Sequence, residues 1–287
     1  MSSSTAAPCS PRQIACVVFD VDDTLYDKGT GFSDHRNFDG APNFMVQHLG
    51  FPSLDEAKAL RNAYFAKYHS TAKALQQAQA DGKFPPSAMT KFESKDLDDY
   101  FATKLDFEIL GGPKSDNFQS DMRELSKKVE LVAFSNGPRN YVIRVLQELG
   151  LWGTDTDKEK AIFSAERLFA VNDTLPHCKP EKEAFDKVFA SLTQTSSTSL
   201  LQPHQCIMVE DSMKNIRKAK ELGLGTILIV GEGKLHPSNE DEPLDDGPVV
   251  NDPAVDVAIE TIEELRTVLP GLWEDPPVFV PPTNKNK

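Results

Sequence analysis

Two carboxylates that follow an apolar run near the N-terminus carry the clearest chemical signal in this sequence. The run IACVV at 14–18 leads into FDVDDTLY, so Asp20 and Asp22 stand where a strand would end. Side chains alternate along a strand with period two, which would place both carboxylates on the same side. Two like charges held that close need a counter-ion, and Mg²⁺ suits them because it prefers a few hard oxygen ligands and keeps waters for a phosphate group. The alternative is a solvated acidic turn, in a chain with 44 acidic residues.

Other polar groups stand at comparable places further along the chain. Ser135 and Asn136 follow a second apolar run, Glu210 and Asp211 follow a third, and Lys179 precedes a helix in HCKP. A hydroxyl with backbone amides at a helix N-terminus can cradle an anion, and acids can hold a cation. Each feature alone has a plainer explanation, because Ser, Asn and acids are common helix caps and most lysines lie on the surface.

The apolar runs are the elements that would bring these groups together. Continuous Val, Ile and Leu runs suit strands buried on both faces, and strands that alternate with amphipathic helices are typical of a doubly wound parallel sheet, an α/β fold. In such a sheet the ligand site lies outside the carboxyl ends of the strands, where the acids, the hydroxyl and the lysine would converge. The predicted strands are 14–19, 131–134, 206–209 and 226–230, with a weaker candidate at 161–163, and the predicted helices are 141–149, 185–192 and 213–222.

A long stretch between the first strand and the rest of the predicted sheet has a different pattern. It shows helical periodicity and hardly a strand signal, with a capping-box-like start at Ser53 and a plausible hinge at 111–113. The glycine-containing stretch 29–40 is expected to be a loop. We expect an α/β core at 12–27 and 112–274, a smaller inserted helical domain at 28–111, and flexible termini at 1–11 and 275–287.

Composition and charge restrict the partners. The chain has 287 residues, of which 39% are hydrophobic and 26% charged, as in ordinary globular proteins. Its net charge of -13 argues against a broad basic surface for a nucleic acid polymer or an anionic membrane, so an anionic substrate would need local positive charge. No apolar run reaches the roughly 18 residues of a membrane span, and the start MSSSTAAPCSP lacks a signal-peptide pattern. We therefore expect a cytoplasmic protein, with the nucleus as an alternative.

The cysteines favour a reducing compartment. Cys9, Cys16, Cys178 and Cys206 show no C-x-x-C pairing and no clustering with the six histidines. Cys16 and Cys206 lie in apolar runs, so we expect them to be small core residues rather than zinc ligands.

Taken together, the motifs resemble those of the haloacid dehalogenase-like (HAD) hydrolase superfamily, and the helical insert resembles its C1-type cap. A closer resemblance is to the pyrimidine 5'-nucleotidase branch of fungi and plants. Three departures from that branch are Ser135 for a common Thr, His69 near a common Gly, and Glu210 for a common Asp. The superfamily motifs are DVDDT at 20–24, FSN at 134–136, KP at 179–180 and VEDS at 209–212; the branch segments are DDTLYD at 22–27, YFAKYH at 64–69, CKPEKEAFDKVF at 178–189, EDSMKNIRKAKELG at 210–223 and IETIEELRTVLPGLWE at 259–274.

The resemblance implies a mechanism. Asp20 would attack the phosphorus and form an aspartyl-phosphate, while Asp22 would protonate the leaving oxygen and then deprotonate the hydrolytic water. Mg²⁺ would be held by the Asp20 carboxylate, the Asp22 backbone carbonyl and the Asp211 carboxylate, with Glu210 acting through bound water. Ser135, the Asn136 amide and Lys179 would hold the phosphoryl oxygens, Thr24 would orient Asp22, and Asn215 would brace the acidic loop.

Specificity would come from the cap, where Tyr64, Tyr68 and His69 are candidates for contacts with a base or sugar. The alternative, which the i, i+4 spacing favours, is that Tyr64 and Tyr68 pack inside the cap.

The resulting expectation is a Mg²⁺-dependent phosphomonoesterase for a small phosphorylated metabolite, first a pyrimidine nucleoside 5'-monophosphate. Pyridoxal phosphate, a sugar phosphate, phosphomutase activity and a catalytically silent binding protein remain alternatives, and the oligomeric state stays open. A hydrolytic dehalogenase is disfavoured, because it would not normally carry the second acid Asp22.

Overall fold

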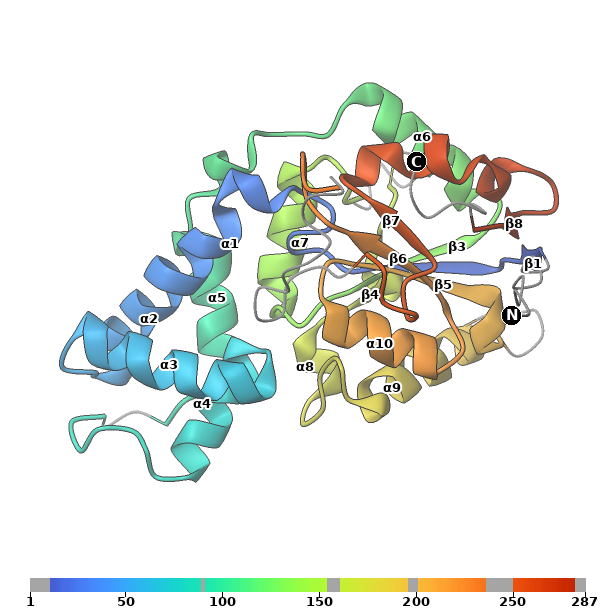
Figure 1. Cartoon of the computed structure of the whole chain (residues 1–287). Helices are drawn as coiled ribbons and strands as arrows, with labels where there is room; N and C mark the ends of the chain where they lie inside the picture. The colour runs from blue at the N-terminus through green and yellow to red at the C-terminus, as the bar shows by residue number, and fades with distance from the viewer. Residues whose placement is uncertain (1–10, 89–90, 154–160, 196–200, 236–249, 282–287) are drawn as a thin grey trace, which may run out of the picture.

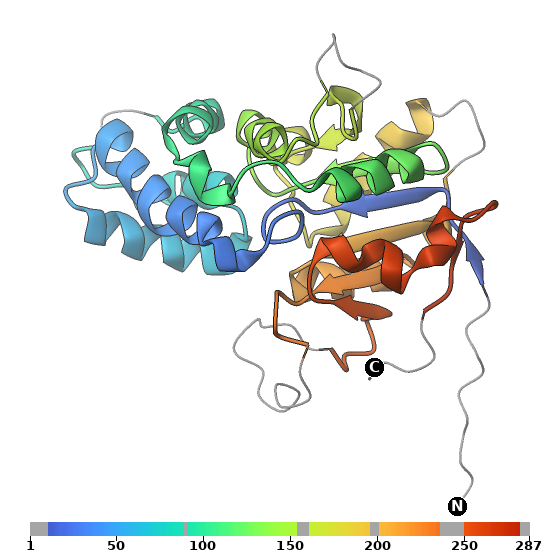
Figure 2. The same cartoon turned by 90° about the horizontal axis from the view of Figure 1, so that it is seen from above.

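A parallel β-sheet covered by helices forms the centre of the molecule (Figure 1, Figure 2). The computed structural model describes residues 11–88, 91–153, 161–195, 201–235 and 250–281. The six strands lie in the order β4-β3-β2-β5-β6-β7, and all neighbouring pairs are parallel, which confirms the predicted doubly wound α/β fold. Their bounds are β2 (Cys16–Phe19), β3 (Glu130–Phe134), β4 (Leu168–Phe169), β5 (Cys206–Glu210), β6 (Gly225–Ile229) and β7 (Val257–Ile259).

The strand order places a topological switch in the middle of the sheet. The chain runs outward from β2 through β3 to β4, returns to β5 on the other side of β2, and then runs outward to β7. A crevice at such a switch point is where open α/β sheets bind ligands. The residues that follow β2 and β5 are the acidic motifs, so the topology brings these two motifs side by side.

Helices flank the sheet, and the first strand shows why both faces are buried. Val17 and Phe19 belong to an apolar cluster with residues of α6, α7 and α11, whereas Cys16 and Val18 belong to a second cluster with residues of α9 and α10. No helix in the described part of the chain is long and apolar enough to cross a membrane. The helix bounds are α6 (Asp116–Ser126), α7 (Arg139–Glu148), α8 (Val171–Thr174), α9 (Lys182–Thr195), α10 (Met213–Glu221) and α11 (Leu265–Val268), with 3-10 turns at Ala165–Arg167, Pro203–Gln205, Ile262–Glu264 and Pro270–Trp273.

The edges of the sheet differ from the sequence prediction. Residues 161–163 do not form a strand; Phe163 makes only an isolated bridge with Trp152. The edge strands are β4 and β7, which the prediction missed because they have two and three residues and so carry little periodic signal.

Residues 28–111, which we call the helical insert, are mostly helical in their described part. Ser53 caps the N-terminus of α3 by accepting a hydrogen bond from the Glu56 amide (3.2 Å). His69 ends α3 in the left-handed region (φ 53°), so the stretch that follows Ser53 forms two helices. The bounds are α1 (Phe32–Asp34), α2 (Ala41–Leu49), α3 (Leu54–Tyr68), α4 (Thr71–Ala80) and α5 (Ser94–Lys104), with a 3-10 turn at Phe107–Leu110.

The expectation of a loop at 29–40 is wrong. The segment contains a 3-10 turn at Lys28–Thr30, then α1, then a π-helix at His35–Gly40. Its Gly, Asp and Asn content suggested a loop, but Phe32 is fully buried and anchors the helical turns in the core. The ring of Phe32 contacts the rings of Tyr26, Phe107 and Tyr141 (centroid distances 5.7, 5.2 and 6.2 Å).

The C-terminal segment is also more ordered than predicted. Strand β8 (Val278–Phe279) pairs antiparallel with β1 (Arg12–Gln13), and Phe279 is fully buried. A Cβ at Gly225 would lie 2.9 Å from the Phe279 ring, so the glycine permits this close packing. The signal was missed because the partner strand lies at the other end of the chain. Residues 1–10, 282–287 and the acidic stretch 236–249 lie outside the described residues.

We predict that Phe32→Ala lowers the free energy of unfolding by about 3–5 kcal/mol, because it removes a buried aromatic ring. Phe38→Ala is the matched control in the same segment: its side chain is 47% exposed, and we expect a change within about 0.5 kcal/mol. Urea unfolding followed by circular dichroism measures both, and equal effects would show that Phe32 does not anchor the segment.

Candidate active site

Lys179 joins the ends of three central strands. Its side chain is 1% exposed, and Nζ donates to Asp20 Oδ1 (2.6 Å), Glu210 Oε2 (2.8 Å) and the Phe134 carbonyl (2.7 Å). Burial acts to lower the pKa of Lys179, but the charges of Asp20 and Glu210 outweigh it and raise that pKa. Because Asp20 follows β2, Phe134 ends β3 and Glu210 ends β5, the predicted convergence of the strand ends is confirmed.

The two carboxylates that bind this ammonium group form a cluster with a third. Oxygens of Asp20, Glu210 and Asp211 lie within 4.8 Å of one another. Burial and the charge of Glu210 raise the pKa of Asp20 to about 8, although Lys179 opposes the shift. Burial and the charges of Glu210 and Asp20 also raise the pKa of Asp211 well above its usual value. One ammonium cannot neutralise three carboxylates, so the hard oxygen donors of this cluster fit a divalent cation such as Mg²⁺.

The side chain of Asp22 is not part of that cluster. Strand β2 ends at Phe19, and the following residues form a turn in which Asp23 has φ 57°. The period-two alternation used in the sequence argument therefore does not extend to Asp22. This leaves Asp22 with its own set of partners.

Three residues that the sequence prediction did not include hold Asp22. The hydroxyls of Tyr26 and Tyr141 donate to Oδ1 (2.7 and 2.5 Å), and Arg36 pairs with Oδ2. Burial acts to raise the pKa of Asp22, but the Arg36 charge and the two hydroxyls outweigh it and lower that pKa. Tyr26 lies only four residues after Asp22, so the sequence itself indicates that the two are close. Arg36 and Tyr141 reach Asp22 only through the tertiary fold.

The remaining predictions near the acidic motifs have different outcomes. The buried hydroxyl of Thr24 has no hydrogen-bond partner among the described residues, and its role in orienting Asp22 stays a prediction. Asn215 is 7% exposed and lies in the first turn of α10, and its bracing role stays a prediction. Glu210 is bound directly to Lys179, and its Oε1 accepts from the Ser212 amide (3.2 Å).

The loop after β3 contains the predicted phosphate-binding residues. Ser135 is 1% exposed, and its Oγ accepts from the Gly137 amide (2.9 Å). The side chain of Asn136 bridges to Lys179: its Oδ1 accepts from the Lys179 amide (2.9 Å), and its Nδ2 donates to the Lys179 carbonyl (2.8 Å). The sequence argument considered only the backbone amide of Asn136 and missed this role of its side chain in positioning the lysine.

Comparison with known families identifies the arrangement. The sequence model described as "Hydrolase: haloacid dehalogenase-like hydrolase" matches residues 14–223, a range that includes the three strand-end motifs and Lys179. The chain belongs to the haloacid dehalogenase-like hydrolase family. A search of curated proteins gave no match to this sequence.

Solved structures of similar fold include a HAD phosphatase from Thermococcus onnurineus (18% identity, 89% of this chain and 98% of that chain, TM-score 0.51). Others are YfnB from Bacillus subtilis, described as a HAD-hydrolase bound to magnesium (17% identity, 90% and 100% coverage, TM-score 0.49), and an L-2-haloacid dehalogenase from Xanthobacter autotrophicus (14% identity, 90% and 99% coverage, TM-score 0.46). At 18% identity the first likeness supports the fold alone.

In this HAD-like hydrolase the helical insert is docked on the strand-end loops. Asn136 Nδ2 donates to the His69 carbonyl (3.2 Å), and Ser70 Oγ donates to the Asn136 carbonyl (3.0 Å). On the other side of the insert, the Asp98 carboxylate accepts from the Tyr141 amide (2.9 Å). His69 has φ 53°, a left-handed conformation that glycine adopts without strain.

The predicted substrate residues of the insert separate into two groups. Tyr64 is 8% exposed, stacks on Tyr68 (centroids 6.1 Å apart) and donates its hydroxyl to Asp81 (2.8 Å). Tyr64 therefore packs inside the insert, as its i, i+4 spacing with Tyr68 favoured, and its substrate contact stays a prediction. Tyr68 and His69 lie next to the core through their backbone: the Tyr68 carbonyl accepts from Cys178 Sγ (3.1 Å). Their substrate contacts stay predictions.

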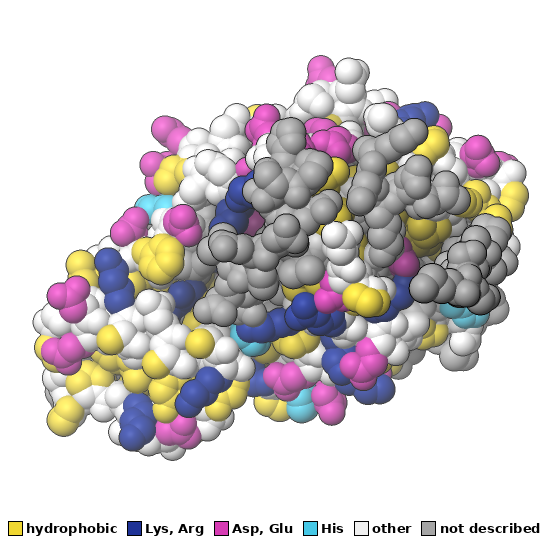
Figure 3. Space-filling view, in the orientation of Figure 1, with side chains coloured by type: hydrophobic (Ala, Val, Ile, Leu, Met, Phe, Trp, Pro, Cys, Tyr) yellow, Lys and Arg dark blue, Asp and Glu magenta, His cyan; other side chains and the backbone are white. Residues whose placement is uncertain are grey.

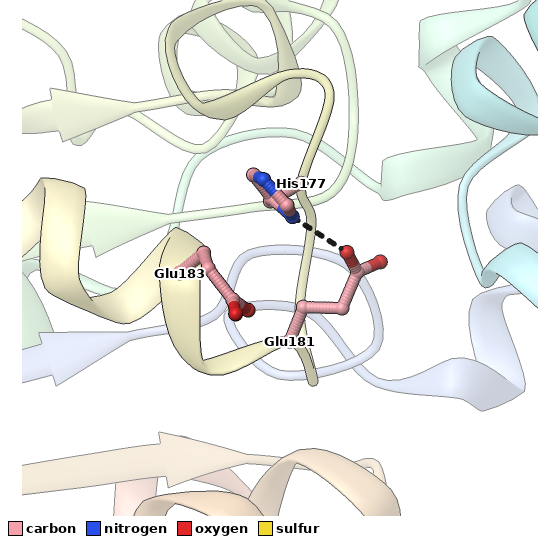
Figure 4. Close-up of side chains that lie close together, drawn as sticks. All are labelled: His177, Glu181 and Glu183. Atoms are coloured by element: carbon pink, nitrogen blue, oxygen red, sulfur yellow. Dashed lines mark hydrogen bonds and ion pairs between the residues drawn. The ribbon is translucent and has the colours of Figure 1, made fainter.

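A second group of possible metal ligands precedes and begins α9. Figure 4 shows the ring of His177 facing the Glu181 carboxylate (Nδ1 to Oε2, 2.9 Å), with Glu183 nearby. Lys73 of α4 forms an ion pair with the other oxygen of Glu181. This ammonium already supplies a counter-charge, so we interpret the group as an ion-pair network that links the insert to the core.

On the face shown in Figure 3, acidic, basic and apolar side chains are interspersed, and some Lys and Arg side chains gather near the middle of the view. No broad basic surface covers the described part of this face. A cavity of about 460 Å³ lies within the insert and shares no residue with the acidic cluster; it is lined by Gln76, Gln79, Ala80, Lys91, Phe92, Glu93 and Ser94.

We predict that Asn136→Ala lowers the free energy of unfolding by about 1–3 kcal/mol, because it leaves the Lys179 backbone and the His69 carbonyl without partners. Asn140→Ala is the matched control: Asn140 is exposed and makes one long bond to Asp99 (3.3 Å), so we expect a change within about 0.5 kcal/mol. Urea unfolding compares the two variants. A change for Asn136→Ala as small as the control's would contradict the bridging role.

Proposed function

We propose that this chain is a Mg²⁺-dependent phosphomonoesterase that hydrolyses a small phosphate monoester through an aspartyl-phosphate at Asp20. The observation that carries the proposal is the buried Lys179 ammonium held between Asp20 and Glu210, with Ser135 at the end of the neighbouring strand. A nucleophile, a cation and a hydroxyl at the carboxyl ends of neighbouring strands are the groups that phosphoryl transfer needs, since its catalysis is largely positioning and charge stabilisation.

In this mechanism Asp20 attacks phosphorus while Lys179, Ser135 and the Asn136 amide hold the phosphoryl oxygens. The carboxylates of Asp20 and Asp211 and the backbone carbonyl of Asp22 would hold Mg²⁺, with Glu210 acting through bound water. When bound, Mg²⁺ supplies positive charge that offsets the phosphoryl oxygens and the carboxylate cluster.

Asp22 is the proposed acid and base. As the carboxylate described above, it is suited to take a proton from the water that hydrolyses the aspartyl-phosphate. To protonate the leaving oxygen in the first step it must itself carry a proton, and the neighbouring Arg36 opposes this by lowering its pKa. A group that offset the Arg36 charge would therefore favour the protonated form of Asp22 and with it the first half of the reaction.

Dehalogenase activity is a weaker candidate. Halide is a stable leaving group that needs no proton, so such a reaction would have no use for Asp22 and its three hydrogen-bonding partners. A phosphate ester releases an alkoxide, which does need one. The presence of a second acid therefore favours phosphate ester hydrolysis.

For the substrate, we propose a pyrimidine nucleoside 5'-monophosphate, with pyridoxal phosphate and sugar phosphates as the alternatives. The support is the resemblance of segments 22–27, 64–69 and 259–274 to the pyrimidine 5'-nucleotidase branch. Tyr68 and His69 are the residues proposed to contact the base or sugar. A phosphate-release screen of nucleotide and non-nucleotide monoesters decides among these substrates.

We predict that the purified protein hydrolyses p-nitrophenyl phosphate with Mg²⁺ and that EDTA abolishes this activity. Asp20→Asn should lower kcat by about a thousandfold or more, because it removes the nucleophile. Asp34→Asn, at an exposed acid of the insert, is the control and should keep wild-type activity. If no phosphomonoester is turned over in the presence of Mg²⁺, the catalytically silent alternative is correct.

A second prediction concerns Asp22→Asn. We expect it to retain Mg²⁺ binding, because its metal ligand is a backbone carbonyl, and to lose steady-state turnover. The rise in Tm on adding Mg²⁺ measures binding independently of activity. Asp211→Asn is the contrasting variant and should lose that rise. Loss of the Mg²⁺ effect in a folded Asp22→Asn protein would contradict the assigned role.

A further inference from the structure

Arg61, in the middle of α3, is a buried guanidinium that has no acidic partner among the described residues. The residue is only 3% exposed, and its guanidinium lies over the Phe65 ring (4.0 Å to the centroid). Its hydrogen bonds go to neutral oxygens: the side-chain carbonyls of Asn62 (3.1 Å) and Asn37 (2.7 Å) and the Thr71 hydroxyl (3.3 Å). Nε has no partner among the described residues.

A neighbouring positive charge, that of Arg36, further disfavours the charged form of Arg61. Burial and then the positive charge of Arg36 lower the pKa of Arg61 to about 9. Within the described part of the chain, Arg36 pairs with the Asp22 carboxylate, whereas Arg61 pairs with no carboxylate. A buried charge is normally paired, so one positive charge in this region lacks its counter-ion.

The unpaired charge lies next to the proposed reaction centre. Asn37 Oδ1 accepts from both Arg61 Nη2 (2.7 Å) and Arg36 Nε (3.4 Å), and Arg36 in turn contacts Asp22. Thr71, the hydroxyl partner of Arg61, directly follows Ser70, which binds the loop after β3. Asp22 is the group proposed to protonate the leaving oxygen, so the arginines lie on the leaving-group side of the site.

We propose that Arg61, together with Arg36, binds a second anionic group on the substrate, a carboxylate or a second phosphate on the leaving-group side of the hydrolysed ester. This inference rests on the proposed phosphomonoesterase function and narrows its substrate class. It is compatible with a pyrimidine nucleotide whose base or sugar carries such a group.

The chemistry of the two side chains suits this ligand. A guanidinium presents N–H donors in a planar fork that matches carboxylate and phosphate oxygens. Nε of Arg61 has no partner among the described residues, and an anion that took up the fork would replace neutral oxygens now bound at its terminal nitrogens.

The test compares substrates that differ by one anionic group. Uridine 5'-monophosphate and orotidine 5'-monophosphate differ by a carboxylate, and fructose 6-phosphate and fructose 1,6-bisphosphate differ by a phosphate. We expect the doubly anionic member of at least one pair to have a kcat/KM about 10- to 100-fold higher, and the two pairs distinguish a carboxylate site from a phosphate site. Equal values within both pairs would overturn the proposal.

Arg61→Met should lower kcat/KM for the doubly anionic member by about 10-fold or more beyond any change for the singly anionic member, so that the ratio falls to about one. Arg266→Met is the matched control, since Arg266 lies on α11, is 40% exposed and pairs with Asp121 and Glu124 of α6; it should preserve the ratio. A loss in Arg61→Met that is equal for both members would assign Arg61 a purely structural role. If Arg61→Met does not fold, Arg61→Lys should retain only part of the preference, and the wild-type comparison stands by itself.

Calorimetry on Asp20→Asn separates this inference from the proposed function, because it measures binding without turnover. The doubly anionic ligand should bind about 10-fold or more tightly than its partner, and Arg61→Met in the Asp20→Asn background should remove the difference. A binding difference without any hydrolysis by the wild type would leave the anion site standing and reject the hydrolase. Hydrolysis by the wild type without a binding difference would support the hydrolase and reject the anion site.

Discussion

The rest of the site depends on the burial of one ammonium group among carboxylates. Lys179 is out of contact with water and is stabilised only because Asp20, Glu210 and the Phe134 carbonyl converge on it from three different strands. Such an arrangement cannot form locally, since each partner stands far from the others in sequence. The parallel sheet is what brings them together, and its switch point between β2 and β5 determines where the surplus negative charge accumulates.

The strand-end motifs could be predicted because they obey simple local rules. Long apolar runs predicted β2, β3, β5 and β6, and the polar residues after them predicted the site; the structure brings Asp20, Lys179 and Glu210 together. The short edge strands β4 and β7 have too few residues to show periodicity. The pair β1 and β8 was missed because each strand exists only through a partner at the other end of the chain.

The surroundings of Asp22 could not be predicted either, because they too consist of residues that only the fold brings together. Arg36 lies on a segment whose composition indicated a loop, and the burial of Phe32 is what makes that segment helical. Tyr141 belongs to a helix of the core, and its apolar periodicity gave no sign that its hydroxyl reaches Asp22. Arg61 likewise resembled any other basic residue of an amphipathic helix. Charge, burial and distance together distinguish it, and these exist only in the fold.

The apolar interior of the insert is continuous with that of the sheet. Phe32, Phe44 and Phe101 of the insert belong to the same cluster as Phe19 and Tyr141 of the core. An insert with its own separate interior could swing as an independent body and melt in a separate transition. In this chain a wide separation of the insert from the core would expose their shared aromatic surface to water, which is unfavourable. Thermal unfolding should therefore be a single cooperative event, and substrate entry should need only a small shift of the polar contacts around Asn136.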